Sequence, residues 1–337
     1  MLMRSLFRRS LRFIGLLSFV ALQIPSAVEA QEPSELVIDE AVEFDFNSLV
    51  FGELAEIPSD PQETGTDIQP VTVTPGESAS AEDGSLAKAA QNPIASLISL
   101  PIQWNSTPSS QWAPNVVDSN AKHNQTQTVV NVQPVVPFKV NKELTLVTRT
   151  IVPFISQPFS GSTSIQGLGD INPSVFFVPT LKGNFTVGVG PTVIIPSATD
   201  SRLSSGRWSG GPTGVLVYSK GKVVAGGLVN NVWSFAGGGK KDVNKMLFQP
   251  FLNYNLPKGW YLSSSPIVTV NWMSEGNKGW MVPVGAGVGR VFRLGSQPVN
   301  ASLSAYYNLV KPEIAGEVLA GDWTLRFQFQ FLFPAGG

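Results

Sequence analysis

Hydrophobic and polar residues alternate along many short segments of the chain, and the clearest case is residues 323–333. One set of alternate positions holds Trp323, Leu325, Phe327, Phe329, Phe331 and Phe333, and the set between them holds Thr324, Arg326, Gln328 and Gln330. Successive side chains of a β-strand point to opposite faces. The segment therefore predicts a strand with one aromatic, oily face and one polar face.

Segments of this kind recur along most of the chain, each about ten residues long. The predicted strands lie near residues 97–104, 127–138, 143–154, 168–179, 183–195, 207–219, 222–234, 245–255, 259–272, 279–291, 298–309 and 322–333. These are twelve strands, an even number as in most single-chain bacterial barrels. The alternation is weakest in 168–179 and 222–234, so ten or fourteen strands are the alternatives.

The polar faces of these strands consist mainly of Ser, Thr, Asn, Gln and Gly. Such side chains would fill the dry core of a soluble β-sandwich poorly and leave polar groups unsatisfied, whereas water in a lumen satisfies them. The segment 260–272 has a tryptophan at each end, as aromatic girdles at two membrane surfaces require. The sequence therefore predicts an all-β fold, a closed antiparallel transmembrane β-barrel of about 12 strands in the outer membrane.

Prolines interrupt the predicted strands at several points. Because proline cannot donate a hydrogen bond to the neighbouring strand, we expect bulges or bends at these positions and an irregular barrel. The positions are Pro134, Pro153, Pro191, Pro212, Pro250, Pro266 and Pro283.

The first thirty residues have the organisation of a secretory signal peptide. Four arginines between residues 4 and 12 precede an apolar stretch, residues 13–24, and a small-residue cleavage motif ends at Ala30. The apolar stretch is shorter than the about 20 residues that a membrane-spanning helix needs. We predict that residues 1–30 are removed after Ala30, with an uncleaved anchor and a twin-arginine signal as the alternatives.

Charge divides the remaining chain into two parts. Residues 31–85 hold fourteen acidic residues and no Lys or Arg, and their composition predicts a mostly disordered periplasmic tether. Within it, residues 36–51 carry apolar side chains among the acids and are a candidate segment for binding a periplasmic partner. Residues 86–337, the predicted barrel domain, hold nineteen basic and nine acidic residues. This excess can attract anionic solutes, lipid headgroups or the tether, or can lie in solvated loops.

Short sequence fragments, in this order along the chain, resemble one bacterial family. They are Leu86-Ala87-Lys88, Asn92-Pro93-Ile94-Ala95-Ser96-Leu97-Ile98-Ser99, Arg149-Thr150-Ile151-Val152-Pro153, Gly167-Leu168-Gly169-Asp170, Gly188-Val189-Gly190-Pro191, Pro196-Ser197-Ala198-Thr199-Asp200, Asn231-Val232-Trp233-Ser234 and Gln249-Pro250-Phe251-Leu252. They resemble the outer-membrane β-barrels called "neuromedin U" or "transporter", related to the MetA-pathway-of-phenol-degradation-like barrels. The resemblance spans nearly all of residues 86–337.

This resemblance implies an outer-membrane barrel that passes small, in part hydrophobic, molecules and contacts outer-membrane lipids and the barrel-insertion machinery. Two features depart from the family. The acidic segment is longer, and the chain continues for four residues beyond Phe333, whereas such barrels end on or near an aromatic residue that the insertion machinery recognises.

Little in the sequence points to catalysis. The chain has no cysteine and one histidine, His123, in a predicted connection without a marked serine nucleophile. We therefore predict no catalytic, cofactor-binding or metal-binding residue, and the dispersed basic residues do not predict nucleic-acid binding. In Gly167-Leu168-Gly169-Asp170 we expect a turn that enters a strand, with a lumen or gate role for Asp170 as the alternative.

Alternation also predicts which side chains face the lumen. The candidates are Arg149, Asn253, Asn271, Tyr306, Arg326, Gln328 and Gln330. An arginine facing lipid would cost roughly 2–4 kcal/mol at the midplane, so Arg149 and Arg326 are expected inside, where they attract anions or form salt bridges that rigidify the wall. The function predicted is a passive channel or transporter for small solutes. The alternatives are a structural barrel whose tether recruits a partner and, less favoured, a lipid-acting barrel enzyme.

Overall fold

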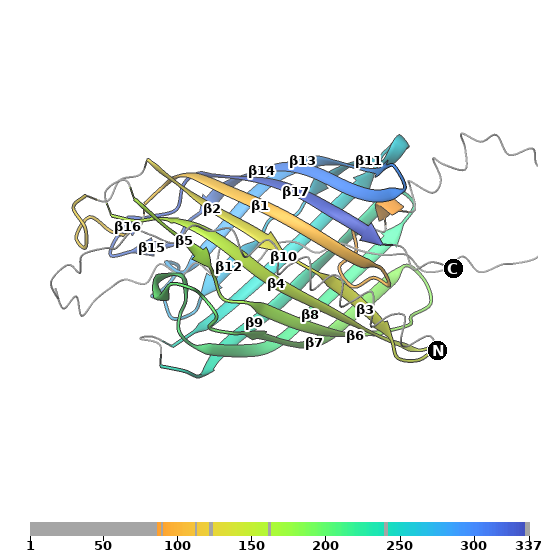
Figure 1. The fold of residues 1–337 in the computed structure, drawn as a ribbon, viewed down its shortest axis with the longest axis horizontal. Coiled ribbons are helices and arrows are strands. Elements are labelled where there is room, and N and C mark those ends of the chain that lie inside the picture. Colours follow the sequence, from red (N-terminus) through yellow and green to blue (C-terminus); the bar gives the residue numbers. More distant parts are fainter. Residues whose placement is uncertain are drawn as a thin grey trace, which may run out of the picture. The chain divides into compact units, whose positions relative to one another are not determined.

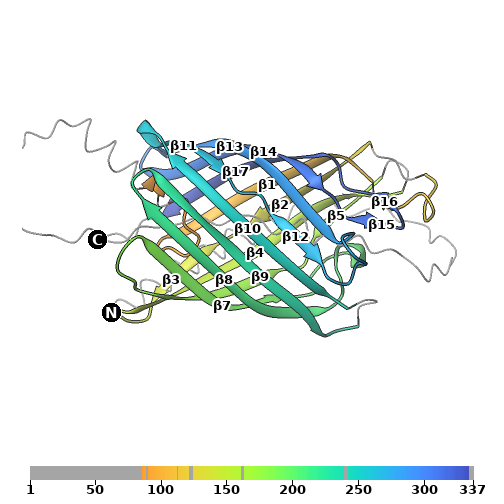
Figure 2. The ribbon, with the colours of Figure 1, turned by 180° about the vertical axis from the view of Figure 1, so that it is seen from behind.

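The computed structural model describes residues 86–88, 90–111, 113–120, 124–160, 163–238 and 242–333. These residues form one antiparallel β-barrel (Figures 1 and 2). The predicted signal peptide, the acidic segment 31–85 and His123 lie outside the described residues. Among the described residues, no helix has the length and apolar character needed to cross a membrane.

Fifteen strand segments and two short 3-10 helices build the barrel and its connections. The strands are β1 (Ile98–Ser110), β2 (Gln125–Val132), β3 (Val135–Lys139), β4 (Leu144–Pro158), β5 (Ser164–Leu168), β6 (Asn172–Pro179), β7 (Phe185–Ile194), β8 (Trp208–Lys220), β9 (Val223–Ala236), β10 (Asn244–Asn255), β11 (Trp260–Ser264), β12 (Val268–Asn271), β13 (Trp280–Leu294), β14 (Gln297–Val310) and β17 (Trp323–Phe333). The helices are η1 (Ser201–Leu203) and η2 (Pro257–Gly259), and β15 (Glu313–Ile314) and β16 (Glu317–Val318) form a hairpin outside the barrel sheet.

Neighbouring strands pair antiparallel around the whole sheet, and the first strand closes the ring by pairing with the last. The register of β1 with β17 runs from Ile98 opposite Phe333 to Ser106 opposite Leu325. Three spans consist of two segments each, namely β2 with β3, β5 with β6, and β11 with β12, so the barrel has twelve spans. The predicted fold and strand number are confirmed, including the two weakest assignments, which correspond to β5 with β6 and to β9.

The prolines act in different ways. Pro134 and Pro266 lie in the breaks between β2 and β3 and between β11 and β12. Pro283 lies at a register shift between β13 and β14. Pro153, Pro191, Pro212 and Pro250 stay within continuous strands. The expected irregularity is therefore present at three of the seven positions, whereas the other four are accommodated without a break.

The outer surface of the barrel is apolar. Trp104, Leu303 and Phe327 are among many large apolar side chains that are about half exposed. Aromatic pairs lie near both ends of the spans: Tyr307 with Trp323 at one end and Phe185 with Tyr218 at the other, with ring centroids 5.2 and 5.0 Å apart. An apolar belt bounded by aromatic rings is the exterior that a bilayer requires.

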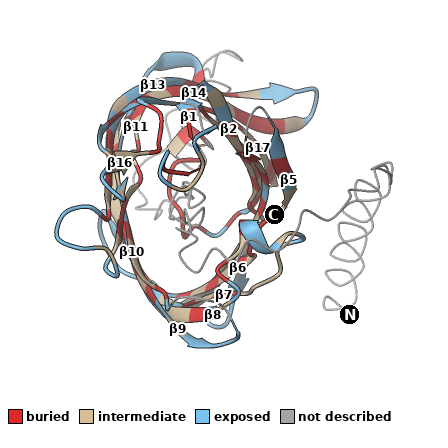
Figure 3. Cartoon of the chain, turned by 90° about the vertical axis from the view of Figure 1, so that its left-hand side faces the viewer, coloured by how far each residue is buried: buried red, intermediate tan, exposed pale blue. Residues whose placement is uncertain are grey.

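The two ends of the barrel differ in their connections. The end at which β1 begins and β17 ends carries short turns, residues 140–143, 180–184, 221–222, 256–259 and 295–296. We call it the turn end. The opposite end, the loop end, carries longer connections such as 195–207 and 311–322, and Figure 3 views the barrel from this side. Because outer-membrane barrels have short periplasmic turns, the turn end corresponds to the periplasm.

Candidate functional site in the barrel lumen

The inner surface has two chemically different walls. On β1, β2, β14 and β17 the buried positions are mainly polar: Gln103, Asn105, Thr107, Gln127, Asn131, Asn300, Ser304, Asn308, Arg326, Gln328 and Gln330. On β4 and β6 to β10 many buried side chains are aliphatic or aromatic and lie among polar ones such as Arg149, Asn230 and Gln249. The apolar ones form one hydrophobic cluster, which includes Val147, Ile151, Ile155, Phe176, Ile194, Val215, Val217, Leu228, Val232, Leu247 and Phe251. We call these the polar wall and the apolar wall. The sequence analysis expected a polar interior throughout, so the apolar wall is a correction.

The physical reason lies in strands whose two faces are both partly apolar. In β4, Val147, Ile151 and Ile155 are buried while Leu146, Val152 and Phe154 alternate with them on the other face. Alternation with a period of two residues identifies a strand. When apolar residues occupy both faces of that strand, the alternation does not reveal that its inward face is also apolar.

Hydrogen bonds connect side chains of the polar wall across neighbouring strands. The Gln103 Nε2 atom donates to Gln328 Oε1 at 3.2 Å, and the Asn105 Nδ2 atom donates to Gln103 Oε1 at 3.1 Å. Asn300 Nδ2 donates to Gln330 Oε1 at 3.1 Å. These hydrogen bonds lower the cost of burying the amides, although among the described groups the Gln330 Nε2 atom has no hydrogen-bond partner.

Arg326 spans the polar wall. Its Nε atom donates to Asn105 Oδ1 at 2.9 Å and its Nη1 atom donates to the Ser265 carbonyl oxygen at 2.8 Å. Between these contacts the guanidinium lies 4.7 Å from the centre of the Tyr306 ring, close enough for a cation–π interaction. The Tyr306 hydroxyl in turn accepts a hydrogen bond from the Ser265 amide at 3.3 Å. Arg326 and Tyr306 thus join β17 and β14 to the break between β11 and β12.

A row of glycines on β13 lets a tyrosine lie against the barrel wall. A Cβ atom at Gly289 would stand 2.2 Å from the Tyr261 ring, so only glycine leaves room for it. The Tyr261 hydroxyl donates to Asn300 Oδ1 on β14 at 2.7 Å. This close approach gives Gly289 a packing role.

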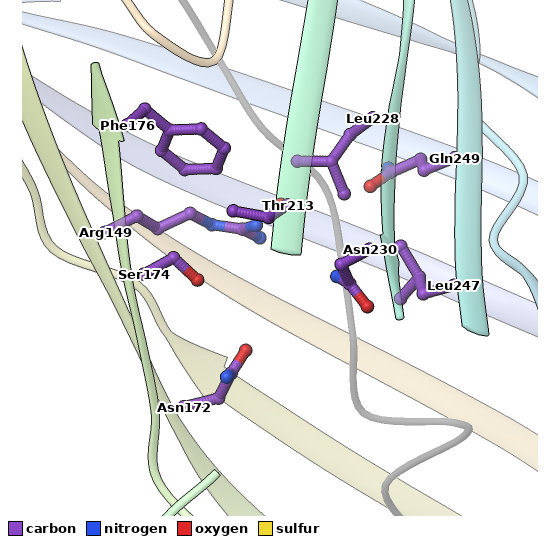
Figure 4. Close-up of a pocket in the computed structure, with 9 residues that line it drawn as sticks. All are labelled: Arg149, Asn172, Ser174, Phe176, Thr213, Leu228, Asn230, Leu247 and Gln249. Atoms are coloured by element: carbon purple, nitrogen blue, oxygen red, sulfur yellow. The ribbon is translucent and has the colours of Figure 1, made fainter. Parts of the chain in front are cut away.

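The apolar wall contains a pocket with a charged group on its edge. It is a small pocket between β4, β6, β8, β9 and β10 (Figure 4). The residues that line it are Arg149, Asn172, Ser174, Phe176, Thr213, Leu228, Asn230, Leu247 and Gln249. Figure 4 shows the Arg149 side chain extending between Phe176 and Ser174 toward Thr213.

Arg149 is 6 % exposed and lies near the middle of β4, opposite Val135 on β3 and Ser174 on β6. Its Nη2 atom donates to Gln133 Oε1. Gln133 is itself fully buried in the break between β2 and β3. There its backbone N–H donates a hydrogen bond to the Pro101 carbonyl oxygen at 2.9 Å. The position of the guanidinium is therefore set by a side chain that the barrel backbone holds.

A segment before the first strand lies inside the turn end of the barrel. Gln91 and Asn255, the last residue of β10, exchange side-chain hydrogen bonds of 2.8 and 2.9 Å. Ile94 is 2 % exposed and belongs to the hydrophobic cluster of the apolar wall. Ala87 and Ala90 belong to a second cluster, with residues of β11, β13 and β17. Residues 86–97 thus narrow the turn end, which alternation did not predict. We call them the inner segment.

Two of the fragments that resemble the known family come together at the loop end. The Asp170 carboxylate is buried and accepts hydrogen bonds from Ser204 Oγ at 2.8 Å and from the Ala198 amide at 3.3 Å. The Thr199 amide donates to the Leu168 carbonyl, and the Leu168 amide donates to Thr199 Oγ1, both at 3.0 Å. Asp170 thus holds the loop 195–207 against the break between β5 and β6, while Gly167 and Leu168 lie at the end of β5.

The seven candidate lumen residues lie at different depths. Arg149, Asn253, Tyr306, Arg326, Gln328 and Gln330 are buried side chains of β4, β10, β14 and β17. Asn271 ends β12 at the loop end, is half-buried, and accepts a hydrogen bond from the Met273 amide at 3.1 Å. Sequence reasoning did not include Gln133, Phe176, Leu228 or Leu247, which surround Arg149 or line its pocket. For Phe176, Leu228 and Leu247 a signal was the apolar character of both faces of their strands.

Solved outer-membrane proteins resemble this barrel, whereas no family model and no curated protein sequence matches the chain. An outer membrane channel from Pseudomonas putida F1 aligns with a TM-score of 0.51 and 15 % identity over 72 % of this chain and 96 % of that one. The NanC porin aligns with a TM-score of 0.43 and 11 % identity over 69 % and 98 %. The Salmonella typhi outer membrane phospholipase aligns with a TM-score of 0.36 and 13 % identity over 70 % and 90 %.

The chain is an outer-membrane β-barrel. The closed antiparallel sheet, the apolar belt with aromatic rings at both ends, and the fold shared with the Pseudomonas putida channel agree on this point. In the part of the barrel that the structure describes, no three His, Asp or Glu side chains are grouped so that they could hold a metal ion.

Proposed function

We propose that the barrel is a passive channel or transporter for small solutes, related to the family called "neuromedin U" or "transporter". The observation that carries the proposal is the lumen itself, because hydrogen-bonded amides line one wall while a pocket opens in the other. No catalytic step is part of this proposal.

The inner segment lies in the turn end of the passage. Gln91 and Ile94 hold it by hydrogen bonds to Asn255 and by burial in the apolar wall. Replacing both, as Gln91→Ala with Ile94→Ala, removes these contacts without changing the strands. We expect the double variant to conduct more current than the unmodified barrel.

Planar-bilayer recordings together with solute flux into proteoliposomes test the proposal. We expect discrete conductance for the unmodified chain and a larger one for the double variant, whereas Lys278→Ala, in an exposed loop, should leave conductance unchanged. Absence of both current and flux in folded protein, judged by faster migration of unboiled samples in electrophoresis, would refute channel function.

A second candidate function is a structural barrel whose acidic segment 31–85 recruits a periplasmic partner. The observation that favours it is the place of Leu86, which packs against the cluster of Leu97, Val291 and Leu332 at the turn end. The segment that precedes Leu86 therefore joins the barrel on the periplasmic side. Deleting residues 31–85 should then remove envelope proteins that co-purify with the full chain. Unchanged co-purification and envelope integrity would exclude this alternative.

A further inference from the structure

One charged side chain within the barrel strands faces the membrane. Arg290 alternates with the buried residues Gly289 and Val291 on β13, and it is exposed on the same outer face as Val288. The charged residues of the described barrel strands are all basic, and the others either lie on the inward face (Arg149, Lys245, Arg293 and Arg326) or end a strand (Lys139 and Lys220). A charge inside the lipid-facing surface of a strand is costly unless it lies near an interface.

Two aromatic rings hold the Arg290 guanidinium near the turn end. Trp260, the first residue of β11, lies directly opposite Arg290 in the register of β11 with β13, and its ring centre is 5.3 Å from the guanidinium. The centre of the Phe292 ring is 6.0 Å away. A cation–π interaction extends to about 6 Å. Because exposed tryptophans of membrane proteins lie at the level of the lipid headgroups, these contacts place Arg290 at that depth.

The rings leave the N–H groups of Arg290 available. In the part of the barrel that the structure describes, no hydrogen bond or ion pair joins these groups to another residue. On β14 the residue opposite Arg290 is Ala301, whose side chain is a single methyl group. A guanidinium at headgroup depth with donors to spare suits a phosphate, because the fork of N–H groups on arginine matches two phosphate oxygens.

The next row of residues toward the middle of the barrel is apolar. Leu262, Val288 and Leu303 lie opposite one another on the neighbouring strands β11, β13 and β14 (Figure 2). Their exposed fractions are 53, 40 and 58 %. We call them the apolar row. A phospholipid meets both rows, since its phosphate reaches Arg290 while its acyl chains lie along the apolar row. A free phosphate or an acidic peptide in water would use only the first.

We propose that Arg290 and Trp260 form a binding site for an anionic phospholipid of the inner leaflet, with the phosphate on the guanidinium and the acyl chains along the apolar row. The leaflet follows from the turn end, which faces the periplasm. Exposed Lys222 and Lys258, in the turns before β9 and β11, add a positive potential that favours a headgroup with net negative charge. The site does not depend on the channel function.

Native mass spectrometry of the full chain, released from neutral detergent micelles, tests the site with two lipids that have the same acyl chains. Phosphatidylglycerol has a net negative charge, whereas the choline of phosphatidylcholine compensates the phosphate. We expect the first phosphatidylglycerol to bind at least fivefold more tightly than phosphatidylcholine and to stay bound in an excess of inorganic phosphate. Equal binding of the two lipids would overturn the proposal. Displacement by inorganic phosphate would show a site for a free anion and would overturn the assignment to a lipid.

Variants assign the preference to this place on the barrel. Arg290→Gln should weaken phosphatidylglycerol at least fivefold and leave phosphatidylcholine unchanged, whereas Arg290→Lys, which keeps the charge without the fork, should retain part of the preference. The matched control is Lys220→Gln, which removes an exposed charge from the same end and outer face at β8 and should change nothing. An equal loss in Lys220→Gln would mean that binding follows the total charge of the turn end, and full preference in Arg290→Gln would contradict the site.

Two further chains cover the remaining outcomes. If Arg290→Gln does not fold, judged by loss of the fast-migrating band in electrophoresis, Trp260→Leu decides the assignment, because it removes the ring and should also weaken phosphatidylglycerol. Unchanged binding in Trp260→Leu would contradict the site. A chain without residues 31–85 should show the same preference as the full chain. A preference that appears only after this deletion would mean that the acidic segment occupies Arg290 and would overturn the proposal.

Discussion

Three charged side chains are buried in the described barrel, and their neighbours differ in kind. Arg149 meets Gln133 and a pocket, Arg326 meets Asn105, Tyr306 and a backbone carbonyl, and Asp170 meets a serine hydroxyl and a backbone amide. Strand alternation was enough to expect both arginines inside, because lipid excludes them. The contacts of Arg326 with Ser265 and Asn105 could not be predicted, because they join residues 61 and 221 positions apart in the sequence.

The carboxylate of Asp170 supports the loop 195–207. Asp170→Ala would leave the Ser204 hydroxyl and the Ala198 amide without this acceptor, at a cost of about 1–3 kcal/mol each when they stay buried. We expect the midpoint of urea unfolding in lipid vesicles to fall. The matched control is Glu275→Ala, whose side chain is 93 % exposed and should change stability by about 0.5 kcal/mol at most. An unchanged midpoint for Asp170→Ala would show that the loop is held by other contacts.

The same loop should respond to acid through Asp200. The hydrogen bond from the Arg202 guanidinium lowers the pKa of Asp200 below its ordinary value of 3.8. Because the folded-state pKa is the lower one, the ionised carboxylate stabilises the loop above pH 3.8, and this contribution is lost as the pH falls through the folded-state value. The Arg202 amide, which donates to Asp200 Oδ1, should then exchange its hydrogen faster. Hydrogen-exchange mass spectrometry, corrected for intrinsic rates, should show this step in the unmodified chain and none in Asp200→Asn.

At the scale of the strand, the depth of a lipid-facing residue in the membrane determines which substitutions it tolerates. Phe327, near the middle of β17, is 47 % exposed on the outer face, and Leu309, next to the end of β14, is 61 % exposed. Phe327→Arg places a charge near the bilayer midplane and should cost roughly 2–4 kcal/mol, whereas Leu309→Arg near the interface should cost about 0–1 kcal/mol. Urea unfolding of both variants in vesicles measures the difference. Equal costs would mean that the apolar belt does not coincide with the bilayer core.

Glycines within the strands also differ in whether they can be replaced by a residue with a side chain. A Cβ atom at Gly190 on β7 would stand 1.9 Å from the Val175 carbonyl oxygen of β6, whereas at Gly214 on β8 the nearest atom would be 3.9 Å away. Gly190→Ala should therefore disturb the pairing of β6 with β7 and lower the yield of the folded, fast-migrating band. Gly214→Ala should fold normally. If both variants fold equally well, the close approach at β6 is relieved by a small movement of the strands.

The strands were predictable and the inner segment was not, for a physical reason. Twelve spans follow from alternation and turns because each span must satisfy the same requirement, one oily face toward lipid. The inner segment 86–97 satisfies no such periodic requirement, since its burial comes from contacts with distant residues such as Asn255 and Tyr261. The apolar wall was not predicted for a related reason, because a lipid-facing surface and an apolar part of the lumen wall are built from the same residue types.

At the scale of the whole molecule, charge is distributed unequally between the two ends. The turns of the turn end and the strand residues beside them carry exposed basic side chains: Lys139, Lys142, Lys182, Lys220, Lys222, Lys258 and Arg293. Among them lies one acidic residue, Glu143. The chain's fourteen acidic residues between 31 and 85 precede the inner segment, which enters the barrel at this same end. A short covalent connection gives two opposite charges a high effective concentration, so we expect the acidic segment to associate with the basic turns.

The absence of cysteine makes this association measurable, because two introduced cysteines are the only labelling sites. Spin labels on Ser59→Cys and Ser296→Cys, the latter at the turn end, should give short distances at about 0.1 M salt that are lost at about 1 M, as the Debye length falls from about 10 to about 3 Å. The matched pair, Ser59→Cys with Ser119→Cys at the loop end, should show no such change. Reversing two turn charges, Lys220→Glu with Lys222→Glu, should remove the short distances, whereas Lys278→Glu at the loop end should keep them. If the distance between the labels at Ser59 and Ser296 does not depend on salt, the acidic segment does not bind the basic turns. The negative lipid headgroups of the inner leaflet are then the next candidate partner of these turns.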